Sequence, residues 1–76
     1  MMADKTLDAK GANCPTPILK AKNAIVEVPV GGTLEVLATD PGSVADFQAF
    51  CHTTGNTLIE QSEVSGVYRF LIRRVG

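Results

Sequence analysis

The sequence predicts a two-layer α/β (α+β) sandwich in which two helices cover one face of a four-stranded mixed sheet. A chain of 76 residues has room for one small hydrophobic core, so we expect a single domain over residues 1–76. Glycine- and proline-rich breaks divide the chain into short segments. The hydrophobic periodicity of these segments predicts strands and helices in the order β-α-β-α-β-β. Because each helix then joins two strands through a crossover, both helices are expected on the same face of the sheet.

A strand, a helix and a second strand are predicted in the first half of the chain. Residues 6–10 alternate between apolar and polar side chains, as a half-buried strand does. The helix opens at Pro15 and runs to about Glu27, before the proline at position 29. A glycine pair then leads into a strand over residues 33–39. One stripe of the helix is apolar and is formed by Ile18, Ala21, Ile25 and Val28.

The second half is predicted to form a helix and a β-hairpin. The helix spans residues 43–54 and ends at Gly55, since glycine is typical of the position after a helix. Its apolar stripe is formed by Val44, Phe47 and Cys51, with Phe50 at the margin. Strands over residues 57–64 and 67–75 follow, and the Ser-Gly pair between them suits a two-residue hairpin turn.

The last strand indicates how the two faces of the sheet are used. Its apolar face is formed by Tyr68, Phe70 and Ile72. Its other face is formed by Arg69, Leu71 and Arg73. We therefore expect the second face of the sheet to be partly polar and open to solvent or to a partner.

The composition excludes several classes of protein. The net charge is −1 and the isoelectric point is near 5.6. A general nucleic-acid-binding domain usually has an isoelectric point above about 9. The polar residues 1–6 contain no signal-peptide core, and no segment approaches the roughly 20 apolar residues that span a bilayer. With no export signal, the two cysteines predict free thiols in the reducing cytoplasm rather than a disulfide scaffold.

Cys14 is the strongest candidate for chemistry because of the prolines that follow it. Proline is favoured at the first position of a helix, where its missing N–H group is not needed. Pro15 therefore places Cys14 at the helix N-cap, and Pro17 makes the same segment more rigid. The helix dipole and unpaired N–H groups favour a thiolate there, below the usual cysteine pKa of about 8.5. The thiolate attacks sulfane sulfur or a disulfide; the alternative is a small apolar residue that tolerates the bend.

Cys51 and His52 are predicted to have no chemical role. Cys51 lies on the apolar stripe of the second helix, and free cysteine is among the residues most often buried. Adjacent helical residues do not face each other, so a Cys–His pair is not expected and His52 is placed in solvent. The chain contains neither a C-x-x-C pair nor the paired ligand spacing of zinc modules. We expect no metal site and no cofactor.

Other charged residues are weaker candidates. Asp40 precedes a proline, and on one interpretation it forms a turn. On the other interpretation it lies near Cys14, since Asp40 and Cys14 each precede a helix of the same layer. Lys20 follows Cys14 by nearly two turns, so its field there would be screened by solvent. Candidates for docking an acidic partner surface are Lys22, Arg69, Arg73 and Arg74. These basic side chains fit a solvated surface equally well.

The sequence resembles the TusA family, also called SirA-like proteins. The resemblance rests mainly on the Cys-Pro-x-Pro motif. In this sequence context the motif is specific to the family, whereas a Cys-Pro pair alone would not be. Length and order of elements also agree, over nearly the whole chain. The matching segments are Leu7-Asp8-Ala9, Gly11, Cys14-Pro15-Thr16-Pro17, Ala38-Thr39-Asp40-Pro41, Phe50 and Tyr68-Arg69-Phe70-Leu71-Ile72-Arg73.

The resemblance implies a fold like the C-terminal domain of a translation initiation factor, and a persulfide on Cys14. It implies a cysteine desulfurase or rhodanese as sulfur donor and a TusD/DsrE-type protein as acceptor. The sulfur would serve tRNA 2-thiouridine formation, molybdenum cofactor synthesis or cytoplasmic sulfur oxidation. Lys20 matches a lysine commonly found after the motif, and Arg69 and Arg73 match the basic final strand. We expect neither direct nucleic-acid binding nor membrane association, and a monomer when the protein is free.

Two other functions are consistent with the sequence. One is an RNA- or protein-binding domain without chemistry, in which the face of Arg69 and Arg73 would matter and Cys14 would not. The other is a redox regulator with a single thiol, in which Cys14 would cycle through a sulfenic acid or a mixed disulfide. The absence of a second cysteine close to Cys14 in the sequence weighs against the redox regulator.

Overall fold

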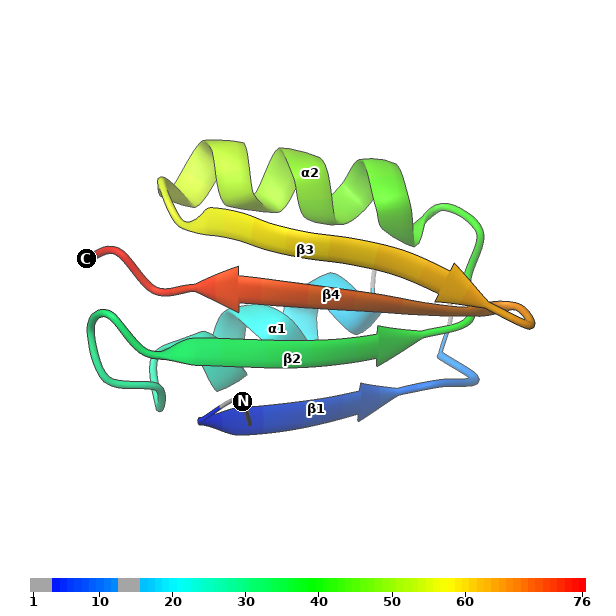
Figure 1. The fold of residues 1–76 in the computed structure, drawn as a ribbon, viewed down its shortest axis with the longest axis horizontal. Coiled ribbons are helices and arrows are strands. Elements are labelled where there is room, and N and C mark those ends of the chain that lie inside the picture. The colour runs from blue at the N-terminus through cyan, green and yellow to red at the C-terminus, as the bar shows by residue number, and fades with distance from the viewer. Residues whose placement is uncertain (1–3, 13–15) are drawn as a thin grey trace.

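The computed structural model describes residues 4–12 and 16–76 and has the predicted order of elements. These are β1 (Lys5–Ala9), α1 (Thr16–Ile25), β2 (Thr33–Ala38), α2 (Ser43–Thr54), β3 (Thr57–Val64) and β4 (Val67–Arg73). The strands form one sheet, with α1 behind β2 and β4 and α2 along the β3 side (Figure 1). The two-layer sandwich of a four-stranded mixed sheet and two helices is thus confirmed. Among the described residues, no helix is long and apolar enough to cross a membrane.

The sheet has the strand order β1-β2-β4-β3 and mixes parallel with antiparallel pairing. β1 pairs with β2 in parallel, with Leu7 opposite Val36. β4 is antiparallel to both of its neighbours and places Phe70 opposite Val36. Because β1 and β2 are parallel, their carboxyl ends lie at the same edge of the sheet, and both helices begin at that edge (Figure 1).

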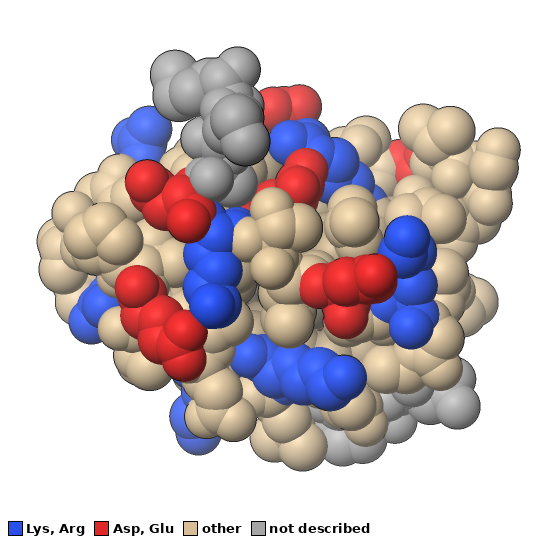
Figure 2. Space-filling view, turned by 90° about the horizontal axis from the view of Figure 1, so that it is seen from below, with Lys and Arg blue, Asp and Glu red and all other residues tan. Residues whose placement is uncertain are grey.

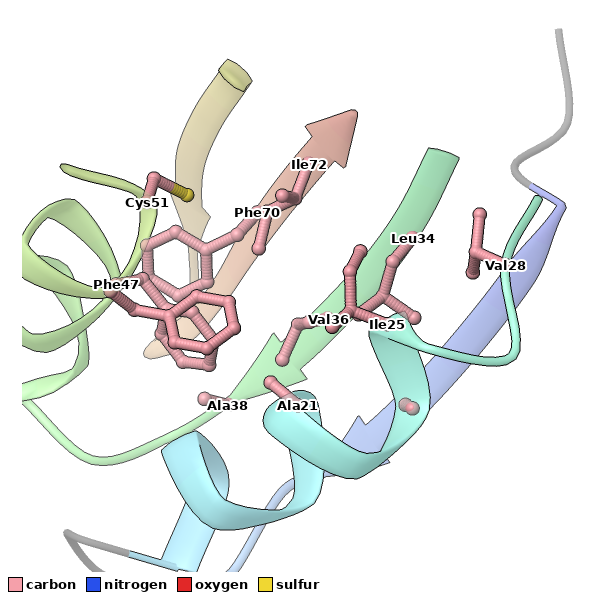
Figure 3. Close-up of a cluster of buried hydrophobic side chains, with 12 residues drawn as sticks. Ala21, Ile25, Val28, Leu34, Val36, Ala38, Phe47, Cys51, Phe70 and Ile72 are labelled. Carbon is pink, nitrogen blue, oxygen red and sulfur yellow. The ribbon is translucent and has the colours of Figure 1, made fainter. Parts of the chain in front are cut away.

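The core lies between the helices and the inner face of the sheet (Figure 3). The ring of Phe47 in α2 stacks on Phe70 in β4 with centroids 4.7 Å apart. Phe50 meets Phe47 edge-on at 6.1 Å. At 8% exposure Phe50 belongs to the core and is the most exposed of its buried residues, which agrees with its predicted place at the margin of the helix stripe. The apolar stripe of α1 is confirmed, since Ala21 and Ile25 are buried.

Helix α1 ends at Ile25, two residues before the predicted end. The N–H of Glu27 donates to the carbonyl of Ala24 at 3.0 Å, and that of Val28 donates to Ile25 at 3.1 Å. These bonds reach back three residues instead of four, which tightens the last turn. The cause is Pro29, because the residue before a proline disfavours helical backbone angles.

The first and last strands end earlier than the prediction, and side-chain acceptors lie at both of these ends. The N–H of Lys10 donates to Asp8 Oδ1 at 3.0 Å, so β1 ends one residue earlier than expected. The N–H of Val75 donates to Asn56 Oδ1 at 2.9 Å, and β4 ends two residues before position 75. In both cases a side-chain oxygen accepts the N–H group of a residue beyond the strand end, which sequence periodicity alone does not reveal.

The predicted turn residues occupy the backbone conformations for which they were identified. Ser65 and Gly66 have φ angles of 52° and 83°, the positive values that a type I′ hairpin turn requires. Gly55 ends α2 with a φ of 79°, and its N–H donates to the Cys51 carbonyl at 2.9 Å. The hairpin turn and the end of the second helix are therefore confirmed.

Opposite charges alternate along the β1 edge of the sheet. Lys5 Nζ lies 2.9 Å from Glu27 Oε1, and Lys10 Nζ lies 3.9 Å from Asp8 Oδ2. Figure 2 views this edge and shows basic and acidic side chains intermingled rather than gathered by sign. Charged side chains on an edge strand oppose pairing with the edge of another sheet.

Candidate functional site at the carboxyl ends of β1 and β2

The candidate site lies where the chain leaves β1 and β2 and enters the two helices (Figure 1). Ala9 and Ala38, the last residues of the two strands, are paired. Beyond them, the N–H of Gly11 donates to Thr39 Oγ1 at 2.9 Å. The segment that leads to α1 is thus fastened to the segment that leads to α2, although the two are far apart in the sequence.

The predicted nucleophile lies between described parts of this edge. Cys14 and Pro15 fall outside the described residues, so the N-cap position and the persulfide role remain predictions. On one side the chain is described up to Ala12, whose N–H donates to the Ala9 carbonyl at 3.2 Å. On the other side it resumes at Thr16, the first residue of α1. The motif therefore joins two segments that border the same edge.

Pro17, the second proline of the motif, is buried at the start of α1. The sequence indicated a rigid segment, because proline restricts the backbone. Its burial adds a second effect, since the ring is removed from water at the beginning of the helix. Movement of the helix start would expose this apolar surface, so the described flank of the motif is held by packing as well as by covalent geometry.

Asp40 forms the turn that enters α2. Its Oδ1 accepts a hydrogen bond from the N–H of Gly42 at 3.3 Å, and its carbonyl accepts one from the N–H of Ser43 at 3.0 Å. These are the bonds of the predicted Asx turn. The preceding residue, Thr39, also contacts Gly11, so the Asp40 turn lies beside the segment that follows β1. A contact with Cys14 remains a prediction.

Ser43 is a residue of this edge that the sequence did not single out. It is the first residue of α2 and is only 1% exposed. Its Oγ has no hydrogen-bond partner among the described residues. A serine at a helix start usually indicates a capping residue. Here Gly42 occupies the cap position instead, and nothing in the sequence predicts that Ser43 is buried.

The lysines predicted to support the site lie on the exposed surface of α1. Lys22 borders an open groove of about 400 Å³ between the two helices. The other residues that line this groove are Ile18, Asp46, Ala49, Phe50, Thr53 and Thr54. Lys20 is exposed and does not line the groove. Of the two lysines, only Lys22 is therefore placed beside an apolar surface that a partner could use.

The three arginines grouped by the sequence occupy different environments. Arg69 lies on the outer face of the sheet, where its Nε donates to Glu35 Oε2 and its Nη1 lies 3.8 Å from Glu60 Oε1. Arg74 donates through Nη1 to the carbonyls of Val26 at 3.0 Å and Val28 at 2.8 Å, beyond the end of α1.

Arg73 is exposed and pairs in the sheet with the first residue of β2. Because β4 runs antiparallel to β2, this is the end of the sheet opposite the candidate site (Figure 1). The expected basic group is thus corrected to three separate side chains, two of which have acceptors within the protein. Binding of a partner by any of them remains a prediction.

Cys51 and His52 have the surroundings expected from the sequence. Cys51 is 5% exposed in the core (Figure 3). Burial raises the pKa of its thiol, because the thiolate loses hydration there. The neighbouring His52 is exposed. Within residues 4–12 and 16–76, no three His, Cys, Asp or Glu side chains come together in a group that could hold a metal ion.

The chain is a small α/β protein in which two helices begin at the edge where two parallel strands end (Figure 1). The sequence profile of one family, described as "Sulfurtransferase TusA", matches residues 5–74. The chain belongs to the TusA family.

Individual relatives match the chain over nearly its whole length. A sulfur carrier protein TusA from Allochromatium vinosum is 52% identical over 71 residues, which cover 93% of each chain. A sulfur carrier protein TusA from Pseudomonas aeruginosa is 42% identical over 71 residues, 93% of this chain and 90% of the relative. A crystal structure of a SirA-like protein from Desulfitobacterium hafniense has a TM-score of 0.82 and 30% identity, covering 95% of this chain and 99% of that one.

Proposed function

We propose that this protein is a cytoplasmic sulfur carrier that accepts sulfane sulfur as a persulfide on Cys14 and passes it to a thiol of a partner protein. The observation that carries the proposal is the Cys-Pro-x-Pro motif, which joins β1 to α1 within a chain that belongs to the TusA family. The relatives named sulfur carrier proteins support it, since they match over more than nine-tenths of this chain.

The chemistry requires one accessible thiolate and no cofactor. The Cys14 thiolate attacks the outer sulfur of a persulfide on the donor, R–S–SH. A new S–S bond forms at Cys14 while the donor S–S bond breaks, and the donor leaves as the thiolate R–S⁻ with the bonding electron pair. The transferred sulfur keeps its proton and its oxidation state, so no oxidant or reductant is consumed. Release is the same exchange with Cys14 as the donor: the acceptor thiolate attacks the outer sulfur, and Cys14 leaves as a thiolate.

Partners supply what a small carrier lacks. We propose a cysteine desulfurase or a rhodanese as donor and a TusD/DsrE-type protein as acceptor, in tRNA thiolation, molybdenum cofactor synthesis or sulfur oxidation. Docking beside the motif is supported by the groove between α1 and α2, which Lys22 borders. Leu19 is 55% exposed on the same helix, so apolar and basic surface are both available on α1. Contacts of this kind fix orientation and speed encounter.

The redox alternative is disfavoured by Cys51, whose thiol is buried and therefore in a poor position to resolve an oxidised Cys14. The RNA-binding alternative is disfavoured by Arg69, whose charge faces two glutamates rather than an open basic surface. RNA binding would show as an affinity that falls steeply with salt and depends on Arg69 and Arg73. We expect no such affinity.

Loading with sulfur tests the proposal. The protein is incubated with a cysteine desulfurase, L-cysteine and pyridoxal phosphate. Mass spectrometry then measures the tryptic peptide of residues 11–20, which contains Cys14. A persulfide adds about 32 Da to this peptide. We expect the gain in the wild type and in Cys51→Ser, and none in Cys14→Ser. A gain that persists in Cys14→Ser on another peptide, or that Cys51→Ser abolishes, would show that Cys14 is not the sulfur site.

A further inference from the structure

The groove between α1 and α2 continues into a second hollow, and together they form one interhelical groove. The first part has a volume of about 400 Å³ and the second part about 230 Å³. Lys22, Phe50 and Thr54 line both parts, so the two are neighbours. Along α2 the interhelical groove extends from Asp46 to Thr54, which is about 12 Å at 1.5 Å per residue. It is therefore long enough for about two helical turns or four residues of extended chain.

The lining of the interhelical groove is largely apolar. Phe50 is 8% exposed and lines both parts, so its ring lies at the bottom of the groove. Ile18 and Ala49 line the first part, and Ile25 and Val26 line the second. Burial of this surface under the apolar side chains of another molecule is favourable, because the surface is then removed from water.

Charge is distributed unevenly along the interhelical groove. Asp46 lines the first part near the starts of the helices, whereas Lys22 lies where the two parts meet. Among the described residues, no ion pair joins Lys22 to Asp46 or to any other acidic group. Arg74 and Gly76 also line the second part, but Nη1 of Arg74 is occupied by two backbone carbonyls beyond the end of α1. Lys22 is therefore the cation of this groove that is available to an acidic group.

Other described surfaces have their charges matched within the protein. On the outer face of the sheet, Arg69 is paired with Glu35, and its Nη1 lies 3.8 Å from Glu60 Oε1. At the β1 edge, basic and acidic side chains are intermingled (Figure 2). The interhelical groove differs from both surfaces, because it combines an open apolar lining with an unpaired cation. This combination fits an apolar segment that carries an acidic residue.

The interhelical groove begins beside the described part of the Cys-Pro-x-Pro motif. Pro17, the last residue of the motif, is buried in the first turn of α1. The next residue, Ile18, lines the groove. A protein that acts on the motif therefore meets this groove. In the proposed function two proteins do so, because sulfur arrives from a donor and leaves to an acceptor.

We propose that the interhelical groove binds an apolar segment of a partner protein with an acidic residue of that segment at Lys22, and that the sulfur donor and the sulfur acceptor use this groove in turn. The identity of the two partners rests on the proposed function. Asp46 repels an acidic residue at the other end of the groove, so the charges determine the direction in which the segment lies. Since one groove serves both partners, the carrier leaves the donor before it binds the acceptor.

Initial rates of sulfur transfer test the role of Lys22. Loading from a cysteine desulfurase, and delivery from the loaded protein to a TusD/DsrE-type acceptor, are followed by intact mass over a range of concentrations of this protein. We expect Lys22→Gln to raise the KM of both reactions about threefold and Lys22→Glu about tenfold, because an exposed ion pair is first lost and then reversed. The kcat of both reactions is expected to stay unchanged.

Asn23→Glu is the matched control for charge. It lowers the net charge by one, as Lys22→Gln does, at an exposed position of α1 that does not line the groove. We expect it to keep the KM of the wild type. At about 0.5 M salt the effect of Lys22→Gln is expected to disappear, because solvent ions screen exposed charges.

Two alanines of α2 test the apolar part of the interhelical groove. Ala49→Gln places a longer polar side chain in the groove and is expected to raise the KM of both reactions about threefold, a rise that persists at high salt. Ala45→Gln, one turn earlier at an exposed position outside the groove, is its control. All of the substituted side chains are exposed, so we expect every variant to melt within about 2 °C of the wild type.

The possible outcomes separate this inference from the proposed function. A wild type that gains no sulfur refutes the proposed function and, with it, the partners assigned to the groove. A wild type that loads, together with an unchanged KM in Lys22→Glu, refutes only the role of the groove. A rise in KM for one partner alone refutes its shared use. Equal rises in Lys22→Gln and Asn23→Glu would show that net charge matters and not this groove.

Discussion

At the scale of single residues, the outer face of the sheet shows how an acidic side chain is accommodated there. Glu35 accepts a hydrogen bond from Arg69 Nε and another from Thr6 Oγ1 at 3.1 Å. The hydrogen bond from Arg69 is the main reason that the pKa of the Glu35 carboxyl is lowered, and partial burial opposes this only in part. The ionised form is therefore favoured in the folded protein more than in the unfolded chain.

The lowered pKa of Glu35 predicts how stability depends on pH. The contribution is present above the unfolded pKa of about 4.3 and is lost as the pH falls through the lower folded value. Both side chains are partly exposed, so we expect Glu35→Gln to lose only about 1 kcal/mol at neutral pH. Urea unfolding of the two proteins from neutral pH downward measures this. A difference that stays constant down to the lowest pH would show that the charge of Glu35 does not contribute.

Single residues also show what the sequence could and could not predict at the site. The burial of Cys51 follows from its place on an apolar stripe, because helical period alone determines which face is covered. The burial of Ser43 Oγ without a hydrogen-bond partner among the described residues could not be predicted, since it depends on how α2 packs against the rest of the protein. The separation of Arg69 from Arg74 was missed for a similar reason: residues close in sequence diverge where a strand ends.

At the scale of elements, Arg74 holds the end of α1 to the segment that follows β4. Its guanidinium donates to the carbonyls of Val26 and Val28. Its backbone N–H donates to Gly32 at 2.9 Å, and its carbonyl accepts from Gly31 at 2.7 Å. A cation that binds the free carbonyls after a helix satisfies acceptors that the helix leaves open. This anchor lies at the edge opposite the candidate site.

Removing this anchor is expected to affect stability alone. We expect Arg74→Met to lower the free energy of unfolding by about 1 to 2 kcal/mol, because charged hydrogen bonds to two carbonyls are lost. Arg73→Met, at the exposed neighbouring position, is the matched control and is expected to stay within about 0.5 kcal/mol of the wild type. Urea unfolding measures both. Equal losses in the two variants would show that general charge matters, not these hydrogen bonds.

The elements themselves were largely predictable, whereas several of their ends were not. The hairpin turn and the end of α2 follow from residues that tolerate positive φ, at Gly66 and Gly55. The early end of α1 comes from the proline that follows Val28. The register shift of β3 between Leu58 and Glu60 has no sequence signal, because the alternation of side chains there is too polar to reveal an extra residue.

At the scale of the whole molecule, the anchor of Arg74 is separate from the candidate site. It lies at the end of the sheet opposite the edge at which β1 and β2 end, whereas the aromatic core lies between the two layers and places Phe47 beside Ala38, the last residue of β2 (Figure 3). That edge combines the start of both helices with the segments tied by Gly11 and Thr39. A carrier with this division can present one thiol to successive partners while its core is unchanged. We expect the wild type and Cys14→Ser to have the same melting temperature within about 2 °C.

Direct transfer from a loaded donor tests the central claim that sulfur moves to Cys14 as part of a thiol exchange. A desulfurase that carries a persulfide on its own cysteine is freed of L-cysteine and mixed with an equal amount of the protein. We predict that the peptide of residues 11–20 gains about 32 Da while the donor peptide loses the same mass, because one S–S bond forms as the other breaks. Loss of the donor sulfur as free sulfide, with the peptide of residues 11–20 at its original mass, would contradict the account.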